Sequence, residues 1–507
     1  MPIQLSGLLH CYQPFRDLYD VTYIPLEEKY SGAVNQRSLI PNPDGTPPKD
    51  WNLELITPEC YKVLANRGVF AKLPFNVGPT LLKDLWINAK DVYDKIIDSE
   101  KESSYRYQGH SNALAQASPN HAIVPLANGD KLKHIEWSFD EYEMHYKKLP
   151  EGVWLPEAAV NRETLLLLAK AGVKYVVLDP RQAKRIRPVL SGENGWINVE
   201  GGRIDPSVPY KLYLDELKKE IAIFFYDKDF SRDIGFEDER KSWMYNNSEN
   251  FIYRWLNARG NFKHFAVDGE TFGHHKKGKA DLLAGSLDLV DKNPQYWSCA
   301  TITNYGLHLQ QNPPTWDVEI IDNSAWSCAH GLIRWGEEKL VKKHENGHSW
   351  EEKLDCNCGS LGSTWRVQMK KAFDKLANNI DKVFSNHANK LFKDPIKALT
   401  NYGQVISSSK TFYEFMNDYG LSNLQDKDIE KAYKLMEMEK FKLYMFTSCG
   451  WFHDYVNRIE PFTNFISASS AIELAKDFEP KLKTEESFLS MLSNDMIQAY
   501  NQAKKIS

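Results

Sequence analysis

The sequence has few cysteines, no long apolar run and no strong net charge, and each shortage excludes a class of protein. Seven cysteines among 507 residues are too few, and odd in number, for a secreted scaffold held together by disulfides. No run approaches the roughly 20 consecutive apolar residues of a membrane-spanning helix. A net charge of −5 gives no reason to expect nucleic acid or an anionic membrane as a partner.

The N-terminal stretch also lacks the features of a targeting segment. The first residues, MPIQLSGLLHCYQPF, contain no basic segment followed by a long apolar core, so we expect no signal peptide. The stretch is typical of a first β-strand instead. Together with the low cysteine content, this pattern predicts a cytoplasmic protein.

Aromatic residues are abundant, with 14 Trp and 25 Tyr. The flat apolar faces of sugars stack on such rings, while polar groups at the ring edges take hydrogen bonds. Most individual aromatic rings in a protein belong to its core. The abundance therefore favours a carbohydrate ligand without assigning the contact to a particular residue.

Short apolar runs recur along the first 300 residues, separated by segments with helical spacing. Alternation of strands and helices predicts a parallel sheet. Because the alternation repeats so often, a barrel is favoured over a small open sheet. The predicted strands are residues 3–9, 73–77, 153–155, 175–178, 221–226 and 262–267.

The pattern changes near residue 360, where strand signals become scarce. Apolar residues from Val367 to Val383 follow helical spacing, and further helical patterns cover residues 428–446 and 471–478. We therefore predict two domains, a β/α barrel over residues 1–355 and a helical domain over residues 356–507.

Polar residues follow several of the apolar runs, which is where catalytic groups of β/α barrels are found. Glu157 follows the run 153–155, and the cluster Asp268 to His275 (DGETFGHH) follows the run 262–267. Asp179 and Asp227 also follow runs, but Asp at such a place commonly caps the next helix.

Two of these acids form a pattern suited to glycoside hydrolysis. Strand alternation would point Asp268 and Glu270 to the same side, and two nearby acids disfavour simultaneous ionisation. Glycoside hydrolysis needs one protonated carboxyl and one ionised carboxylate, and Glu157 is the candidate for the ionised group. Glu270 would either keep Asp268 protonated or hold a histidine, and both interpretations stay open.

At these positions the sequence resembles family 57 of the glycoside hydrolases, retaining enzymes that act on α-glucans. Residues 10–14 (HCYQP), 152–157 (GVWLPE) and 268–273 (DGETFG) are similar to the family's first, third and fourth motifs in order and spacing. Residues 109–121 resemble the second motif in a more divergent form.

The sequence resembles one branch of the family over nearly the whole chain. Residues 323–331 (NSAWSCAHG) lie where the fifth motif falls and are similar only to that branch, which carries a C-terminal helical domain. Further similar stretches are residues 73–80, 355–358 and 447–452.

The resemblance implies an α/β fold, a distorted (β/α)7 TIM-like barrel followed by an all-α C-terminal domain. It implies a retaining double displacement without a metal or other cofactor, with Glu157 as nucleophile and Asp268 as general acid/base. The substrate would be an α-glucan or an α-linked oligosaccharide. The sequence leaves open the sugar, the choice between hydrolysis and transfer, and the oligomeric state.

Nine residues are predicted to contact the sugar. His10 and Gln13 would hydrogen-bond its hydroxyls, whereas Trp154 would either stack on it or form the wall that positions Glu157. Trp326 and the two histidines 121 and 330 fit a structural role equally well. The predicted set is His10, Gln13, His121, Trp154, Glu270, His274, Trp326, His330 and Trp451.

Two other functions are compatible with the sequence. A metal-dependent polysaccharide deacetylase uses Asp and His ligands on a similar barrel, which Asp268, His274 and His275 could supply, although the usual His-x-x-x-His pair is absent. A non-catalytic carbohydrate-binding protein would have no need of both carboxylates.

Four cysteines raise a separate question of metal binding. Cys356 and Cys358, with Cys328 before them and Cys449 after, supply four thiols, a number that binds zinc tetrahedrally. The Cys-x-Cys spacing differs from the usual Cys-x-x-Cys knuckle. Reduced packing thiols are therefore the favoured interpretation, and no metal is predicted.

Overall fold

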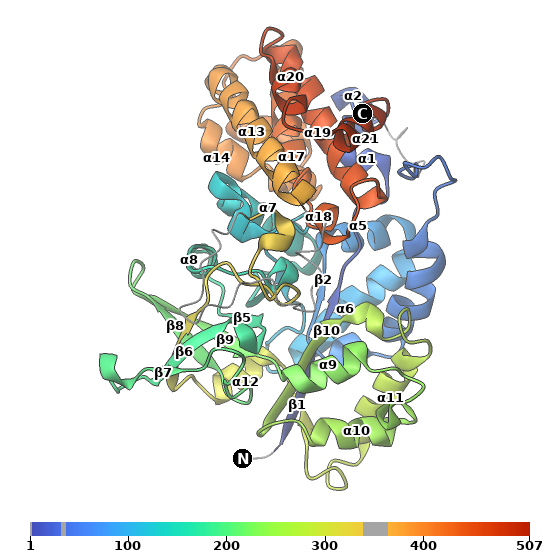
Figure 1. Cartoon of the computed structure of the whole chain (residues 1–507), viewed down its shortest axis with the longest axis vertical. Helices are drawn as coiled ribbons and strands as arrows, with labels where there is room; N and C mark the ends of the chain where they lie inside the picture. The colour runs from blue at the N-terminus through green and yellow to red at the C-terminus, as the bar shows by residue number, and fades with distance from the viewer. Residues whose placement is uncertain (1–2, 32–36, 338–363) are drawn as a thin grey trace. The chain divides into compact units, whose positions relative to one another are not determined.

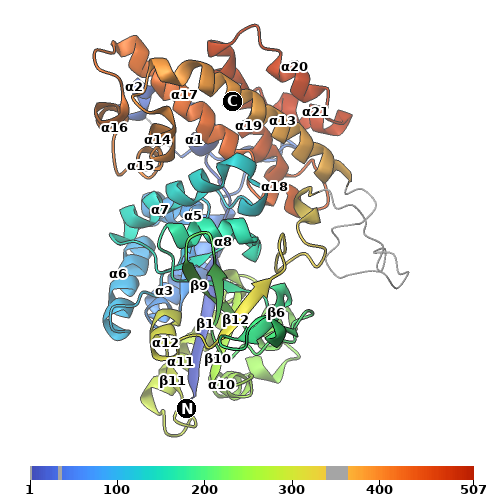
Figure 2. The ribbon, with the colours of Figure 1, turned by 90° about the vertical axis from the view of Figure 1, so that its left-hand side faces the viewer.

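The structure is a computed structural model that describes residues 3–31, 37–337 and 364–507. The chain divides into two compact units. The first unit consists of residues 1–13, 50–117 and 145–326, and the second of residues 14–49, 118–144 and 327–507. All described strands belong to the first unit (Figure 1, Figure 2).

The N-terminal strand is the centre of one sheet. β1 (Gln4–Cys11) pairs in parallel with β10 (Phe262–Asp268), in a register that ends with His10 opposite Asp268. It also pairs in parallel with β11 (Thr301–Ile302) and β2 (Phe75–Val77). Seven of its eight residues are buried, as expected for a parallel strand covered on both faces.

A second sheet holds four further parallel neighbours and an extension that is antiparallel except between β8 (Tyr210–Leu214) and β12 (Trp316–Ile320). β3 (Ala115–Gln116), β4 (Gly152–Trp154), β5 (Tyr175–Leu178) and β9 (Lys219–Phe225) are parallel neighbours in this order. The extension was not predicted from the sequence because its strands have many exposed and polar positions. Its strands, in spatial order, are β8, β12, β6 (Ala183–Pro188) and β7 (Ile197–Asn198).

The two sheets are joined at two places, by one bridge between β2 and a residue just before β3 and by one hydrogen bond between a residue beyond the end of β9 and β10. Phe75 of β2 forms a parallel bridge with Ala113, just before β3. Beyond the end of β9, Asp227 donates its backbone N–H to the carbonyl of His264 on β10 over 2.8 Å. The parallel strands thus follow one another around a ring in the order β1, β2, β3, β4, β5, β9 and β10. The predicted α/β fold is confirmed, and this strand order is consistent with a barrel.

Helices of the first unit connect the strands and pack on them. α8 (Arg162–Lys170) begins at Asn161, whose side chain accepts a hydrogen bond from the Thr164 N–H, and it buries Leu165 and Leu168. The other helices of this unit with four or more residues are η1 (Asn52–Tyr61), α3 (Lys62–Asn66), α4 (Val69–Lys72), α5 (Pro79–Asn88), α6 (Lys90–Arg106), α9 (Lys228–Phe236), α10 (Ser248–Leu256), α11 (Lys279–Lys292) and α12 (Tyr305–Gln311).

The second unit is helical, as the sequence predicted for the C-terminal region. Phe373 and Phe465 meet in its core with ring centroids 5.6 Å apart. Residues 14–49 and 118–144 also belong to this unit. In the first of these segments, the Val21 carbonyl accepts a hydrogen bond from Ser470 over 3.0 Å. Its longer helices are α7 (Lys131–Tyr146), α13 (Thr364–His387), α16 (Phe412–Tyr419), α17 (Asp426–Tyr444), α19 (Ile459–Phe478) and α21 (Asn494–Ala503), and its shorter ones are α1 (Leu18–Val21), α2 (Leu26–Lys29), α14 (Pro395–Thr400), α15 (Gly403–Ile406), α18 (Cys449–Phe452) and α20 (Thr484–Leu489).

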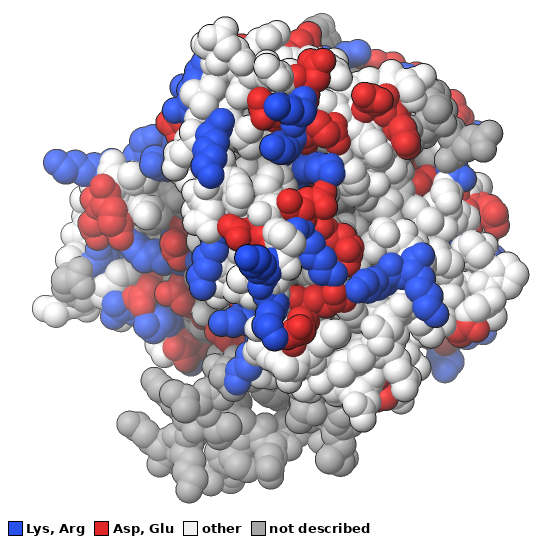
Figure 3. Space-filling model, turned by 90° about the horizontal axis from the view of Figure 1, so that it is seen from above, with Lys and Arg blue, Asp and Glu red and all other residues white. Residues whose placement is uncertain are grey.

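Charged residues of both signs lie intermixed on the face drawn in Figure 3, over the part of it that the structure describes. Within the described ranges, no helix has both the length and the apolar character needed to cross a membrane.

Candidate active site

The site is built around Glu157, which lies in a strained turn directly after β4. Its backbone has φ 58° and ψ 21°, and the next residue, Ala158, also has a positive φ of 48°. Such left-handed conformations are uncommon for residues other than glycine and cost of order 1–3 kcal/mol each. Hydrogen bonds from Ala158 N to the Leu155 carbonyl (2.7 Å) and from Ala159 N to the Pro156 carbonyl (3.0 Å) hold the turn. Strain of this kind accumulates at functional positions.

Trp326 contacts Glu157 through two hydrogen bonds. The indole Nε1–H donates to Glu157 Oε2 over 3.1 Å, and the Trp326 backbone N–H donates to the Glu157 carbonyl over 3.1 Å. A hydrogen bond donated to a carboxylate favours its ionised form. Both side chains are half-buried.

Aromatic rings form a wall beside this carboxylate. The ring centroid of Trp154 lies 4.9 Å from that of Trp326 and 5.2 Å from that of His10. Tyr12 is stacked parallel to His10 at 6.2 Å. Trp154 is completely buried, and its indole N–H has no hydrogen-bond partner among the described residues.

His10 is a neutral histidine with a defined tautomer. The amide nitrogen of Asn76 donates to the Leu114 carbonyl over 3.0 Å, so its oxygen accepts from His10 Nδ1–H over 2.9 Å. Burial lowers the pKa of His10 to about 4, although the bond to Asn76 acts in the opposite direction. His10 Nε2 is therefore an acceptor, suited to a sugar hydroxyl.

Asp268 lies at the end of β10, opposite His10 in the parallel register. Crowding by the surrounding protein raises the pKa of its carboxyl well above the usual value, and the charges of Glu270 and Glu157 raise it further. The residue nevertheless keeps an exposed surface, so solvent weakens the effect of burial, whereas the repulsion from the two glutamates acts in the same direction. Both effects favour the protonated form of Asp268.

Glu270 is buried in the turn after β10 and is held by residues that the sequence did not single out. Its carboxylate accepts hydrogen bonds from Tyr61 Oη and from the Tyr12 backbone N–H, the latter over 3.0 Å. Gln13 also bonds it and donates to Tyr61 Oη over 3.5 Å. Burial raises the pKa of Glu270, and these hydrogen bonds oppose the rise. Glu270 was predicted either to keep Asp268 protonated or to hold a histidine. The first role is supported, because the charge of Glu270 raises the pKa of Asp268.

The turn carrying Asp268 and Glu270 rests closely on β1. A Cβ atom added to Gly269 would lie 2.3 Å from Cys11 Sγ, so only glycine fits without displacement. Cys60 Sγ donates to the Gly269 carbonyl over 3.3 Å. Burial raises the pKa of both thiols, which makes them packing groups rather than nucleophiles.

The adjacent histidines follow the same turn. The backbone N–H groups of His274 and His275 both donate to the Glu270 carbonyl, over 3.2 and 2.9 Å. The His275 side chain is exposed, whereas Nδ1 of the half-buried His274 has no hydrogen-bond partner among the described residues.

Three predicted sugar contacts belong to the second unit. His121 is buried there, with a left-handed φ of 59° and Nδ1 2.7 Å from Ser448 Oγ. Trp451 is buried and donates its indole N–H to the Arg366 carbonyl over 3.1 Å. His330 is half-buried. Their contact with sugar stays a prediction.

The predicted cap residues do cap the following turns. Asp179 accepts from the Arg181 N–H over 2.8 Å, and Asp227 accepts from the Phe230 N–H over 2.9 Å. Of the four cysteines considered for metal binding, Cys356 and Cys358 lie outside the described residues, and Cys328 and Cys449 are thiols of the second unit.

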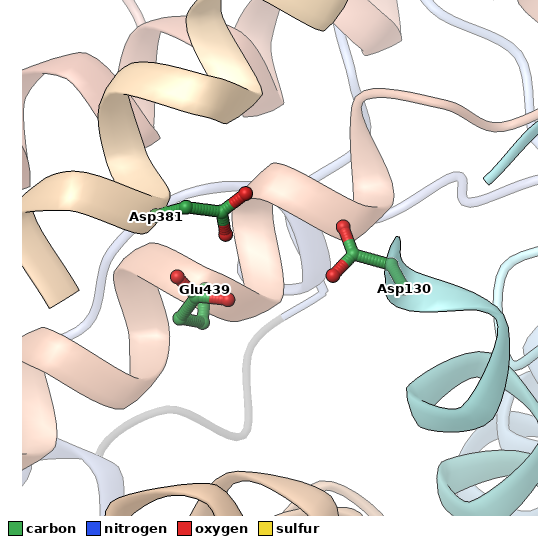
Figure 4. A group of neighbouring side chains, drawn as sticks. All are labelled: Asp130, Asp381 and Glu439. Atoms are coloured by element: carbon green, nitrogen blue, oxygen red, sulfur yellow. The ribbon is translucent and has the colours of Figure 1, made fainter. Parts of the chain in front are cut away.

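One acidic cluster of the second unit has the spacing of metal ligands. Asp130 just before α7, Asp381 of α13 and Glu439 of α17 have carboxylate oxygens within 4.8 Å of one another (Figure 4). Two lysines pair with it, and Lys442 Nζ lies 2.5 Å from Asp381, 2.7 Å from Glu439 and 3.2 Å from Asp130. Lys133 pairs with Asp130 and Glu439. The cluster is therefore a partly buried ion-pair network rather than a cation site.

Comparison with known proteins gives two family matches. The glycosyl hydrolase family 57 pattern matches residues 76–307, and a domain of unknown function, DUF3536, matches residues 363–504. No curated protein matches the sequence of this chain.

Several solved structures share the fold. An exo-type maltose-forming amylase from Pyrococcus sp. ST04 is similar with a TM-score of 0.67 and 15% identity, over 96% of this chain and 82% of the amylase. A branching enzyme from Thermococcus kodakaraensis has a TM-score of 0.53 and 13% identity, over 99% and 94% of the two chains. An α-amylase from Thermotoga maritima has a TM-score of 0.51 and 13% identity, over 100% and 97%. At such identities the similarity establishes the fold.

Proposed function

Since this chain belongs to glycosyl hydrolase family 57 through residues 76–307, we propose that it is a retaining hydrolase or transglycosylase acting on α-glucans or α-linked oligosaccharides. Glu157 is the nucleophile and Asp268 the general acid/base. The observation that carries the proposal is the contrast between these two carboxyls: Trp326 donates a hydrogen bond to Glu157 after β4, whereas burial and two neighbouring glutamates raise the pKa of Asp268 at the end of β10.

Each environment suits one chemical role. Glu157 accepts a hydrogen bond from the Trp326 indole, which favours the charged carboxylate that attacks an anomeric carbon. Crowding and two neighbouring glutamates raise the pKa of Asp268, which keeps a proton available for the leaving oxygen. Two carboxyls whose environments give them different pKa values are typical of glycosidases.

The reaction then has two steps. Glu157 forms a bond to the anomeric carbon while the glycosidic bond breaks and Asp268 protonates the departing oxygen. In the second step Asp268, now a carboxylate, takes a proton from water or a sugar hydroxyl, which attacks the glycosyl ester and releases Glu157. We expect the two carboxyl groups to be about 5–5.5 Å apart in the reactive complex, the separation of retaining sites.

Sugar recognition is proposed for the groups around this pair. His10 Nε2 accepts a hydrogen bond from a hydroxyl, Gln13 and His274 bond further hydroxyls, and Trp326 offers a half-buried ring. Trp154 forms the wall behind them. The structural neighbours are two amylases and a branching enzyme, which supports an α-glucan as substrate.

The test uses wild type and Glu157→Ala with maltooligosaccharides, glycogen and aryl α-glycosides, with azide added to the mutant reactions. We expect wild-type turnover to fall by about 10³-fold or more in the variant. Azide should restore turnover of the aryl glycosides and give a β-configured glycosyl azide, as expected when azide occupies the place of the lost nucleophile. Product chromatography separates hydrolysis from transfer.

The control is Glu216→Ala, which removes an exposed glutamate of the same unit and should leave turnover unchanged. Undiminished activity in Glu157→Ala would remove Glu157 from the mechanism. Loss of wild-type activity with a chelator, restored by added metal, would favour the deacetylase chemistry instead.

A further inference from the structure

Trp326 lies in a segment without regular secondary structure after β12, yet it donates two hydrogen bonds to Glu157. Its position is therefore set by tertiary contacts rather than by a helix or a strand. The turn at the end of β5, residues 179–182, supplies these contacts.

Arg181 holds Trp326 by its backbone. Arg181 Nη2 donates to the Trp326 carbonyl over 2.5 Å. The same guanidinium forms a two-pronged pair with Asp179, from Nε to Oδ1 over 2.9 Å and from Nη2 to Oδ2 over 2.8 Å. A fork of this kind fixes the plane of the guanidinium, which a lysine cannot do.

Asp179 is anchored in turn. Only 1% of its side chain is exposed, and Tyr226 donates its hydroxyl to Oδ2 over 2.6 Å. The Tyr226 ring also lies edge-on to the Trp326 ring, with centroids 6.5 Å apart. A buried carboxylate that already accepts from Arg181 and Tyr226 has little freedom to move.

Gln182, in the same turn, bonds to the segments that carry Glu157 and Trp326. Its amide nitrogen donates to the Ala158 carbonyl over 2.8 Å and to the Ser324 carbonyl over 3.2 Å. Ala158 follows Glu157, and Ser324 is two residues before Trp326. The β5 turn thus contacts both sides of the Glu157–Trp326 hydrogen bond.

We propose that Arg181, locked by Asp179 and Tyr226, is a positioning residue that keeps the Trp326 indole N–H on Glu157 Oε2. This inference rests on the proposed function, because it gives Glu157 the role of nucleophile. The bond engages Oε2 and favours the ionised form of Glu157. Arg181 itself touches no reacting atom.

The ionisable groups around this contact come from four strand ends. They are Asp268 at the end of β10, Asp179 and Arg181 after β5, Tyr226 after β9, and His10 on β1. The charge of Glu157 contributes to the raised pKa of Asp268, and burial and Asp179 raise the pKa of Tyr226. Burial lowers the pKa of His10 to about 4, so His10 stays neutral.

The experiment measures kcat and kcat/KM against pH for an aryl α-glycoside that wild type cleaves. The variants are Arg181→Lys, Trp326→Phe and the double variant, with Arg185→Lys as control. Arg181 and Arg185 each expose 42% of the side chain and each pair with one acid, but Arg185 pairs with Glu319 away from the turn.

We expect Arg181→Lys to lower kcat about tenfold, up to the roughly hundredfold effect of a 1 Å misplacement. The acidic limb of kcat/KM should move to higher pH by about one unit, because a nucleophile that loses a donor is protonated more easily. Trp326→Phe should move the limb in the same direction, and adding Arg181→Lys to it should change little. Arg185→Lys should match wild type.

An unmoved acidic limb in Arg181→Lys, or effects of the two substitutions that add in full, would overturn the inference. An equal shift in Arg185→Lys would do the same. If Arg181→Lys does not fold, Tyr226→Phe, which removes only the hydroxyl on Asp179, takes its place with the same expected direction. If Glu157→Ala is fully active, the proposed function fails. If Glu157 is essential and Arg181→Lys behaves as Arg185→Lys does, only this inference fails.

Discussion

The indole nitrogen of Trp326 donates a hydrogen bond to a carboxylate oxygen of Glu157 over 3.1 Å, although 169 positions separate the two residues in the chain. Asp268, by contrast, experiences the charges of Glu157 and Glu270, and no described residue donates a comparable hydrogen bond to it. We therefore expect the two carboxyls to differ in protonation before any sugar binds. The following predictions test this difference and the packing that maintains it.

Asp268→Asn should remove the proton donor while leaving the nucleophile in place. We expect turnover of glucans to fall by about 10²–10⁴-fold, with a smaller loss for aryl glycosides whose leaving groups need no protonation. In wild type, activity falls as pH rises through the raised pKa of Asp268, because the acid must be protonated. That basic limb should disappear in the variant, as a pH–rate profile measures. A basic limb identical to that of wild type would assign it to another group.

Glu270→Gln should change the pH profile without removing a catalytic group. The Glu270 charge raises the pKa of Asp268, so its removal lowers that pKa and moves the basic limb to lower pH, by about one unit. Glu220→Gln, at the exposed start of β9 and paired with Lys211, is the matched control and should not move the limb. A shift to higher pH in Glu270→Gln would contradict this electrostatic role.

Gly269→Ala should destabilise the turn by about 1–3 kcal/mol, the usual cost of overpacking, because its Cβ would lie 2.3 Å from Cys11 Sγ. Thermal unfolding and activity measure the effect. Gly235→Ala, where nothing lies within 4 Å of the added Cβ, should be neutral or slightly stabilising in its helix.

The double variant Cys11→Ala, Gly269→Ala identifies the cause. Removal of the sulfur leaves the Cys11 Cβ at 3.7 Å from the new methyl, an ordinary contact. The added cost of Gly269→Ala should therefore be smaller in the Cys11→Ala background than in wild type. Equal costs in both backgrounds would place the strain elsewhere.

Lys442→Met should strongly destabilise the second unit. Lys442 is completely buried and pairs with Asp130, Asp381 and Glu439, so its loss leaves three clustered carboxylates with Lys133 as their remaining cation, at a cost of about 3–5 kcal/mol. Lys434→Met, on the same helix α17 but in a solvent-exposed pair with Asp477, should cost about 0–1 kcal/mol. Denaturant unfolding of both variants gives the comparison, and similar midpoints would show that the network contributes no net stability.

The same network predicts a direction for acid unfolding. Burial would raise the pKa of Asp130, but Lys442 and Lys133 more than offset this and lower it from 3.8 to about 2. The folded state therefore binds this proton less readily than the unfolded chain does. The resulting stability is fully present above about pH 4 and is lost as pH falls toward 2, which an unfolding series over this range measures.

Local patterns in the sequence were sufficient to predict the strands that carry the site. The apolar runs ending before Glu157 and Asp268 predicted β4 and β10, because a buried parallel strand must be apolar on both faces. Asp179 and Asp227 were predicted as caps for an equally local reason, since a cap bonds to backbone N–H groups two or three residues away.

The antiparallel extension was not predicted because its strands lack a continuous apolar face. The pairing of residues 14–49 and 118–144 with the C-terminal helices was also beyond local patterns. Contacts such as that between Ser470 and the Val21 carbonyl join residues hundreds of positions apart, and no periodicity records them.

By itself, the sequence determined the strand–helix order, the two carboxyls at strand ends and the change to helices near residue 360, because periodicity, caps and motifs act over short separations. Only the tertiary structure decided how those carboxyls differ chemically. Tyr61 on Glu270, Asn76 on His10, and Arg181 and Trp326 beside Glu157 come from distant segments, and protonation depends on the distances and burial that folding creates.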